Sequence, residues 1–501
     1  MIRFRVHDPS GPDGSWSLRW WSLLGPDARP VRGAIARDGD TILCKPADEQ
    51  PVALALLVDA GSAGRLVLQT CFLPSRDEPY DLFVEVARWL IKQFVEESES
   101  WQMWSASLSA EPVAMWEEAR AHFRAALRAE DPLEAERCAR RSIERGVDAG
   151  ERLALRHAEH LLGARYARKP AGSATLGVCI DPSVAPTGAA AAAAKQFDLL
   201  ALRTPWRRIE RVEGTRDFEA IDAWVRWAAA AKKPLVIGPI VDFGADALGR
   251  PDGLPDFVLA ERGDAKRFRE LVWNHVREVT HRYQNATRSF IAVGGANHPC
   301  WKDEGLERMV ELVRTAVVAV RDVRRDAKTV VEIHAPGGES WRGMKGAAWP
   351  TSFLQRIVGE NLGLSAAGVR FTPGPTGDPA RDLMSLAAVL DGFIGRELPV
   401  YISGAGIPSA GAVEENGCWR GPWSPERQTA WGRAFVRIAM ARPFVEGVWW
   451  SRLQDAPGAP ADGVLDEKGQ PKPVFAKLVG FRKRLSRAGA DWRTRETEEA
   501  S

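Results

Sequence analysis

The feature that most restricts the fold of this chain is a regular alternation in its last two thirds. Between residues 174 and 485, short apolar runs typical of strands alternate with amphipathic segments of helical spacing. This order is typical of parallel β–α–β units. Eight such runs occur, at 175–180, 197–202, 234–240, 289–293, 329–334, 368–372, 398–403 and 447–450. Because a (β/α)8 TIM barrel needs eight strands with helices between them, the sequence predicts an α/β fold of that type.

The first 170 residues lack this alternation. Short apolar runs at 52–58 and 65–72 lie between clusters of Gly, Pro and Asp, and residues 82–97 have the apolar spacing of a helix. A stretch rich in Ala, Glu, Arg and Leu follows. We therefore expect a β-rich domain over 1–105, a helical connector over 106–170, the barrel over 171–488 and a disordered tail over 489–501. The β-rich domain is compatible with a carbohydrate-binding module, and also with a structural cap or a dimer contact.

Composition excludes several classes of protein. The net charge is +2 and the basic residues are scattered among acidic ones, which argues against a nucleic-acid partner. No apolar run is long enough for a membrane span. The six cysteines are far apart and form no CxxC pair, so we expect no metal and no other cofactor. The N-terminus lacks the apolar core of a secretory signal, which predicts a cytoplasmic protein. No pattern predicts the oligomeric state.

Several segments between residues 174 and 484 are similar, in order and spacing, to motifs of the family 10 glycoside hydrolases, the xylanase type. The segments with this similarity are RVEGTRDFEAID at 211–222, LPDF at 254–257, RY at 282–283, EGVWWSRLQD at 446–455 and GVLDEKGQPKPVF at 463–475. The resemblance implies a (β/α)8 barrel that acts on or binds β-linked polysaccharide or oligosaccharide.

The resemblance also shows a loss. A retaining glycosidase needs two carboxyl groups about 5 to 5.5 Å apart at the C-terminal ends of barrel strands. The family's acid/base motif falls on 290–295, where its Glu is replaced by Gly295, and its nucleophile motif falls on 402–406, where its Glu is replaced by Gly404. Glycine neither donates a proton nor attacks carbon. We therefore expect no retaining mechanism at these positions and no activity toward xylan.

Four other residues are candidates for relocated catalytic groups. Glu332 and His334 alternate on the fifth predicted strand, so both side chains point toward the barrel axis. Glu339 lies in the loop after this strand, and Glu414 lies beside Glu415 in the loop after the seventh strand. The alternative for Glu332 and His334 is an ion pair that fills the barrel mouth.

Aromatic and acidic residues near the expected strand ends are candidates for substrate binding. The chain has 20 Trp and 4 Tyr, and indole faces stack on sugar rings, although Trp is also an ordinary core residue. The candidates for stacking or polar contact with a saccharide are Trp206, Asp242, Trp419, Trp449, Trp450 and Asp455. For Asp242 and Asp455, which end the third and eighth strands, helix capping is the alternative.

Three hypotheses follow. The first is a carbohydrate-active enzyme with relocated carboxylates, and the second is a saccharide-binding or regulatory protein without catalysis. The third is a scaffold whose barrel mouth is filled by its own loops. Glycine at both catalytic positions favours the last two, because an enzyme that changes only its specificity keeps its carboxylates.

Overall fold

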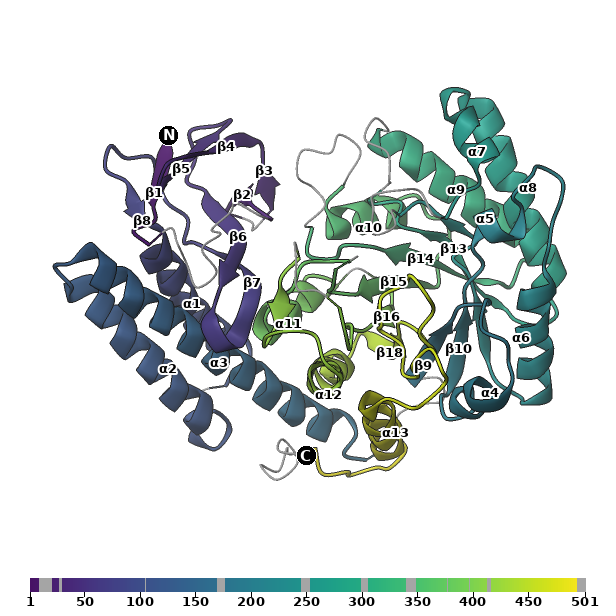
Figure 1. The fold of residues 1–501 in the computed structure, drawn as a ribbon. Coiled ribbons are helices and arrows are strands. Elements are labelled where there is room, and N and C mark those ends of the chain that lie inside the picture. Colours follow the sequence, from purple (N-terminus) through teal and green to yellow (C-terminus); the bar gives the residue numbers. More distant parts are fainter. Residues whose placement is uncertain are drawn as a thin grey trace.

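The computed structural model describes residues 1–8, 20–26, 29–103, 105–168, 176–244, 253–298, 305–338, 348–375, 377–395, 397–411 and 416–492. Two small β-sheets and three helices form the N-terminal part, which lies beside a barrel surrounded by helices (Figure 1). Within the described residues, no helix combines the length and the apolar character that a membrane span requires.

The N-terminal strands form two sheets. The first has the order β4 (Gly33–Asp38), β5 (Thr41–Pro46), β1 (Ile2–Arg5) and β8 (Tyr80–Asp81). The second has the order β17 (Cys418–Trp419), β7 (Gly64–Gln69), β6 (Ala53–Asp59), β2 (Ser22–Leu24) and β3 (Pro30–Val31). The apolar runs predicted at 52–58 and 65–72 are confirmed as β6 and β7. Strand β6 is central and buried on both faces, which explains its continuous apolar sequence.

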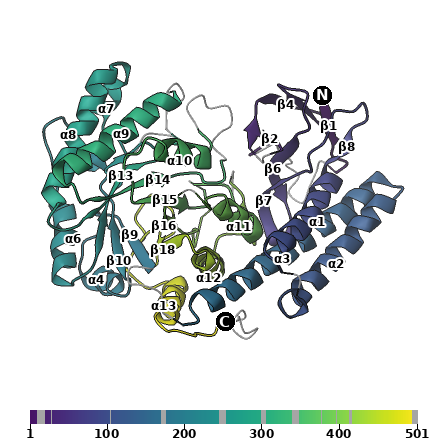
Figure 2. The same ribbon diagram turned by 180° about the vertical axis from the view of Figure 1, so that it is seen from behind.

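Three helices follow the sheets. They are α1 (Leu82–Ser100), α2 (Ala106–Arg128) and α3 (Pro132–Arg165). Asp131 caps α3, because its side chain accepts a hydrogen bond from the Leu133 amide at 3.2 Å, and Pro132 occupies the first turn. Helix α3 packs on α1 and α2 at one end and on α12 of the barrel at the other. Two views of the ribbon show α3 running beneath both parts of the molecule (Figures 1 and 2).

The barrel consists of eight parallel strands in a closed ring. In ring order they are β9 (Leu176–Ile180), β10 (Leu199–Leu202), β11 (Leu235–Ile237), β13 (Ser289–Gly294), β14 (Lys328–Ile333), β15 (Ala366–Phe371), β16 (Val400–Ala405) and β18 (Val445–Trp450). The short strand β12 (Val241–Asp242) also pairs with β13. Each of the eight predicted runs contains a strand, so the predicted TIM barrel is confirmed.

Helices surround the barrel ring. Those described are α4 (Gly188–Ala194), α5 (Trp206–Ile209), α6 (Glu219–Ala230), α7 (Asp256–Ala260), α8 (Ala265–Tyr283), α9 (Leu306–Val323), α10 (Pro350–Val358), α11 (Leu383–Asp391), α12 (Pro425–Ala441) and α13 (Pro473–Leu485), with a short 3-10 turn at Glu261–Gly263. Another 3-10 turn, Gly61–Ala63, connects β6 and β7 in the N-terminal part. Inside the ring, apolar side chains such as Ile291, Val330 and Trp449 fill the lower layers. This packing leaves the C-terminal ends of the strands as the place for a site.

A strand from a barrel loop joins the two parts of the molecule. Strand β17 belongs to the segment after β16, and it pairs antiparallel with β7 at the edge of the N-terminal sheet. The amide of Val67 on β7 also donates a hydrogen bond to the Ala380 carbonyl at 2.9 Å. One continuous cluster of buried apolar residues extends through the N-terminal sheets, α3 and the barrel. The N-terminal part therefore shares its core with the barrel.

The C-terminal tail begins later than predicted. Trp492 is buried, and its ring packs edge-on against Phe481 of α13 at a centroid distance of 5.5 Å. The amide of Gly489 donates to the Tyr166 carbonyl just beyond α3. The expectation of a disordered tail from residue 489 is therefore wrong for residues 489–492, because one aromatic side chain holds them to the core. The rest of the predicted tail lies outside the described residues.

Candidate functional site

Charged side chains form the uppermost layer of the barrel interior. Glu332 on β14 is fully buried and pairs with Arg203, which directly follows β10. One guanidinium nitrogen of Arg203 lies 3.0 Å and 3.3 Å from the two carboxylate oxygens. Arg370 on β15 approaches the same carboxylate at 3.9 Å. The alternation of side chains along β14, predicted from the sequence, places Glu332 toward the barrel axis.

His334 links this layer to the loop after β11. Its Nε2 lies 3.0 Å from a Glu332 oxygen and 4.0 Å from a carboxylate oxygen of Asp242. Asn297 fixes the His334 backbone, because its amide donates to the His334 carbonyl at 2.7 Å and its oxygen accepts from the His334 N–H at 3.0 Å. The side chain of Asp242 accepts from the Gly244 amide at 2.9 Å. The structure therefore brings Asp242, Glu332 and His334 together, as the sequence predicted for the last two.

The surroundings of Glu332 determine its charge. Burial alone would raise the pKa of this carboxyl, but the charge of Arg203, the hydrogen bond from His334 and the charge of Arg370 hold the pKa well below its usual range. Glu332 is therefore ionised at any physiological pH and cannot donate a proton. Because it is also fully buried, it cannot reach an anomeric carbon. Of the two readings of Glu332 and His334, the geometry favours the ion pair that fills the barrel mouth.

Gly295, where the family pattern has the acid/base, has no room for a side chain. Its φ of +66° is a left-handed conformation that favours glycine. A Cβ atom here would lie 2.5 Å from the backbone nitrogen of Gly244 and 2.8 Å from Nδ1 of His334. The Gly295 amide donates to the backbone carbonyl of Glu332 at 3.1 Å. The His334 ring thus occupies the space that an acid/base side chain would need.

Gly404, where the family pattern has the nucleophile, faces two cations. A Cβ atom here would lie 3.4 Å from Nε of Arg370 and 3.6 Å from a terminal nitrogen of Arg203. Nε of Arg370 is buried and has no hydrogen-bond partner among the described residues, and the same holds for Oγ of Ser403, which lies at Gly368, and Oγ of Ser451, which lies at Gly406. Where a retaining enzyme presents a carboxylate, this barrel therefore presents hydrogen-bond donors.

The predicted stacking role is wrong for the four tryptophans, because each is at most 7% exposed. Trp206 lies flat on His275 at 3.9 Å and donates to Glu210. Trp449 is inside the barrel, and the outward-facing Trp450 donates to the Asp462 carbonyl at 2.7 Å. Trp419 donates to Glu151 on α3 at 2.6 Å. These indoles have no free face for a sugar ring, and they act as ordinary core residues.

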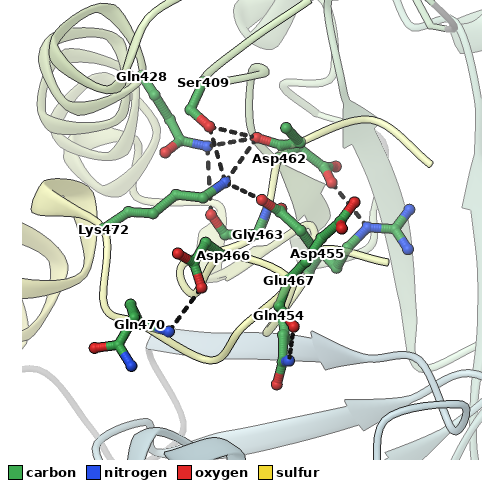
Figure 3. A network of polar contacts seen from close by, with 12 residues as sticks. Ser409, Gln428, Gln454, Asp455, Asp462, Gly463, Asp466, Glu467, Gln470 and Lys472 are labelled. Atoms are coloured by element: carbon green, nitrogen blue, oxygen red, sulfur yellow. Dashed lines mark hydrogen bonds and ion pairs between the residues drawn. The ribbon is translucent and has the colours of Figure 1, made fainter. Parts of the chain in front are cut away.

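Asp455 also has a structural role in place of the predicted contact with substrate. Its carboxylate is buried, pairs with Lys472 at 2.5 Å and accepts from the Gly463 amide at 2.7 Å. Lys472 also donates to Oγ of Ser409 at 2.9 Å (Figure 3). This network holds the segment after β18 against the end of α12. Asp242, by contrast, keeps 27% of its side chain exposed at the barrel mouth.

Two predicted catalytic residues, Glu339 and Glu414, lie outside the described residues, so they stay predictions.

The sequence analysis did not identify three residues of this site, Arg203, Arg370 and Ser403. The signal for Arg370 and Ser403 was present, because each alternates with apolar residues on its strand and therefore points inward. Arg203 lies one residue past β10, where the sequence alone does not fix its direction.

Asp242, Glu332 and His334 also have the composition of a metal site. One ligand atom of each lies within 4.8 Å of the others. However, the guanidinium of Arg203 already neutralises Glu332, and a dication between them would face this positive charge at short range. The cluster is therefore an ion-pair network, and it gives no support to a metal.

Comparison with known proteins finds a likeness of fold. No family model matches the chain, and no curated protein matches it. Among solved structures it is similar to xylanase 10B from Thermotoga maritima, with 13% identity over 66% of this chain and 98% of that one, at a TM-score of 0.47. It is also similar to the endo-1,4-β-xylanase XylE from Penicillium canescens, with 16% identity over 65% and 97% of the two chains, at a TM-score of 0.46. The site is defined by this chain's own residues.

Proposed function

We propose that this protein binds an oligosaccharide or polysaccharide at the C-terminal end of its barrel and does not cleave it by the retaining mechanism. One observation supports the absence of cleavage above all others. At Gly295 the His334 ring and the Gly244 backbone take the space of a catalytic side chain, and at Gly404 two arginines face the position of the nucleophile. Among the residues that the structure describes, the two strand ends that the mechanism needs carry no carboxylic acid as proton donor and no carboxylate nucleophile in place of the two glycines.

The polar groups at Gly404 support a ligand with many hydroxyl groups. Arg370 is 30% exposed, and its Nε has no partner among the described residues. Buried polar atoms are normally paired, so a ligand that accepts hydrogen bonds would complete this layer. The family 10 motifs in the sequence indicate that this ligand is a saccharide. Solved structures similar to this chain include complexes with xylobiose and xylotetraose, which are suitable probes.

Calorimetric titration with xylotetraose tests binding. We expect the wild type to bind it and Arg370→Gln to bind about tenfold more weakly, because a charge-assisted hydrogen bond is lost. Arg288→Gln is the matched control, because Arg288 is exposed and directly precedes β13 at the opposite end of the barrel. Equal affinity in the wild type and Arg370→Gln would show that the barrel mouth is not the binding site.

A second candidate function is hydrolysis by relocated carboxylates. The observation that favours it is the proximity of Asp242 and Glu332, whose nearest carboxylate oxygens lie within 4.8 Å. Full burial of Glu332 argues against it, because the sugar cannot reach this group. A reducing-sugar assay with xylan separates the two functions. We expect no release of sugar, whereas hydrolysis that disappears in Asp242→Asn would establish the relocated pair.

A further inference from the structure

A cavity lies between the N-terminal part and the barrel. Its volume is about 390 Å³, within the range of roughly 300 to 1,000 Å³ that is usual for small-molecule sites. Strands β2, β3 and β7 form one wall, helix α1 forms another, and the loop after β14 with α10 and α11 forms the third. These elements face each other across the middle of the molecule (Figure 1). The barrel wall begins at Pro336, two residues after His334, so the cavity lies on the same side as the barrel mouth.

Tryptophans from all three walls line this cavity. They are Trp20 and Trp21 next to β2, Trp89 on α1 and Trp349 before α10. Unlike Trp206, Trp419, Trp449 and Trp450, these four tryptophans are only partly buried. Indole faces provide apolar area for the flat face of a sugar ring. The indole N–H of Trp20 donates to Oδ1 of Asn416 at 3.0 Å, so Trp20 offers its face and not its donor.

Two buried amide groups point to a polar ligand. Gln93 on α1 is 7% exposed, and its Oε1 accepts no hydrogen bond from the described residues. Gln69 at the end of β7 has a buried Nε2 that donates none to them. Both residues line the cavity. Buried polar atoms are normally paired, so an acceptor and a donor left open in one cavity indicate a ligand that offers both.

The charges at the cavity restrict the ligand further. Glu96 and Glu97 on α1 and Arg381 before α11 all line it, so charges of both signs are present and neither an anionic nor a cationic ligand is favoured. A ligand that has apolar ring faces and hydroxyl groups at its edges, and that carries no charge, fits the indoles, the amides and the carboxylates together. We propose that this cavity is a second binding site, for one or two rings of a neutral oligosaccharide.

This site does not depend on the function proposed for the barrel mouth, and its test separates the two. Fluorescence and calorimetric titrations use xylotetraose and cellotetraose with the full chain. We expect Gln93→Leu to weaken the cavity site about five- to tenfold, because its only lost contact is the hydrogen bond to the ligand. Gln93→Leu also removes an open buried acceptor, so it is expected to fold at least as stably as the wild type. Arg370→Gln leaves this site unchanged.

Controls decide the outcome. Gln196→Leu, which changes an exposed glutamine after α4, is expected to bind like the wild type. Choline tests the alternative that the indoles and carboxylates form a cage for a quaternary ammonium ion. The proposal is overturned if choline binds and the saccharides do not, if Gln93→Leu binds them as tightly as the wild type, or if neither class of probe binds because water alone fills the cavity.

Discussion

Gly295 and Gly404 lie at the C-terminal end of the barrel and supply no side chain for acid/base or nucleophilic chemistry there. The resemblance in sequence aligns Gly295 and Gly404 with the two glutamates of the family pattern, but the surroundings of the two glycines differ. Gly295 has a left-handed backbone and is packed against Gly244 and His334. Gly404 has only ordinary contact distances around the place of a Cβ atom. The acid/base position is therefore closed by structure, whereas the nucleophile position is open and lined by cations.

This difference predicts opposite results for the same substitution. We expect Gly295→Ala to lower the free energy of unfolding by about 2 to 4 kcal/mol, because the methyl group adds backbone strain to a clash with Gly244. Gly404→Ala is the matched control and is expected to change it by less than about 1 kcal/mol, because its nearest neighbour lies 3.4 Å away. Chemical denaturation of both variants measures the change in the free energy of unfolding. Similar decreases in the two variants would refute the claim that only Gly295 lacks room for a side chain.

Strand β17 is an element that the sequence did not predict. Its residues lie in what the sequence presented as a barrel loop with acidic and aromatic residues, yet β17 completes the edge of the N-terminal sheet. The next residue, Arg420, extends to α3 and pairs with Glu151 at 2.5 Å, while Trp419 donates to the same carboxylate at 2.6 Å. One short element thus connects three parts of the molecule.

Removal of Arg420 is expected to destabilise the whole chain. In Arg420→Met the buried Glu151 loses its cation, and we expect a loss of about 2 to 4 kcal/mol in the free energy of unfolding. Arg137→Met is the matched control on α3, because the Arg137–Glu134 pair is exposed, and little change is expected. Adding Glu151→Gln to Arg420→Met should recover part of the loss in denaturant unfolding. Equal stability of Arg420→Met and Arg137→Met would contradict the role of β17.

The sequence predicted strands and helices well where the pattern is local. All eight barrel strands follow from apolar runs, and α1 follows from the spacing of Leu82, Val86, Leu90 and Phe94. It predicted Glu332 and His334 as neighbours because a period of two is a property of one strand. The partners Arg203 and Arg370 come from other strands, and their closeness depends on how the ring closes. Burial of Trp206 and Trp449 depends on the same long-range packing, which is why their predicted role was wrong.

In the molecule as a whole, the N-terminal part and the barrel act as one folded unit. They share a continuous core, the pairing of β17 with β7 and the long helix α3. Separation of the two parts would therefore expose apolar residues that are buried between them. No periodic pattern in the sequence predicts this interface, because it arises from contacts between residues hundreds of positions apart. The cavity with Trp20, Trp89 and Trp349 exists only in the joined molecule. A ligand there is expected to stabilise both parts together.

Glu97 in this cavity makes the stability of the joined molecule depend on pH. Burial, followed by the charge of Asp391 on α11, raises its pKa from 4.5 to about 7, with Arg442 opposing this and Glu96 adding to it. Between pH 4.5 and 7 the folded chain therefore holds a proton that the unfolded chain has lost, so the contribution of this group to stability falls as pH rises through this window. Above pH 7 the loss is complete.

Glu97→Gln removes this titration because the amide stays neutral. We expect the variant to be as stable as the wild type at pH 4.5 and more stable by roughly 1 to 3 kcal/mol at pH 8. Glu99→Gln, an exposed change on the same helix, should show the same small difference at both pH values. Urea unfolding of the three proteins at the two pH values measures the effect. A Glu97→Gln difference that does not grow between pH 4.5 and 8 would show that burial of Glu97 between the two parts does not raise its pKa.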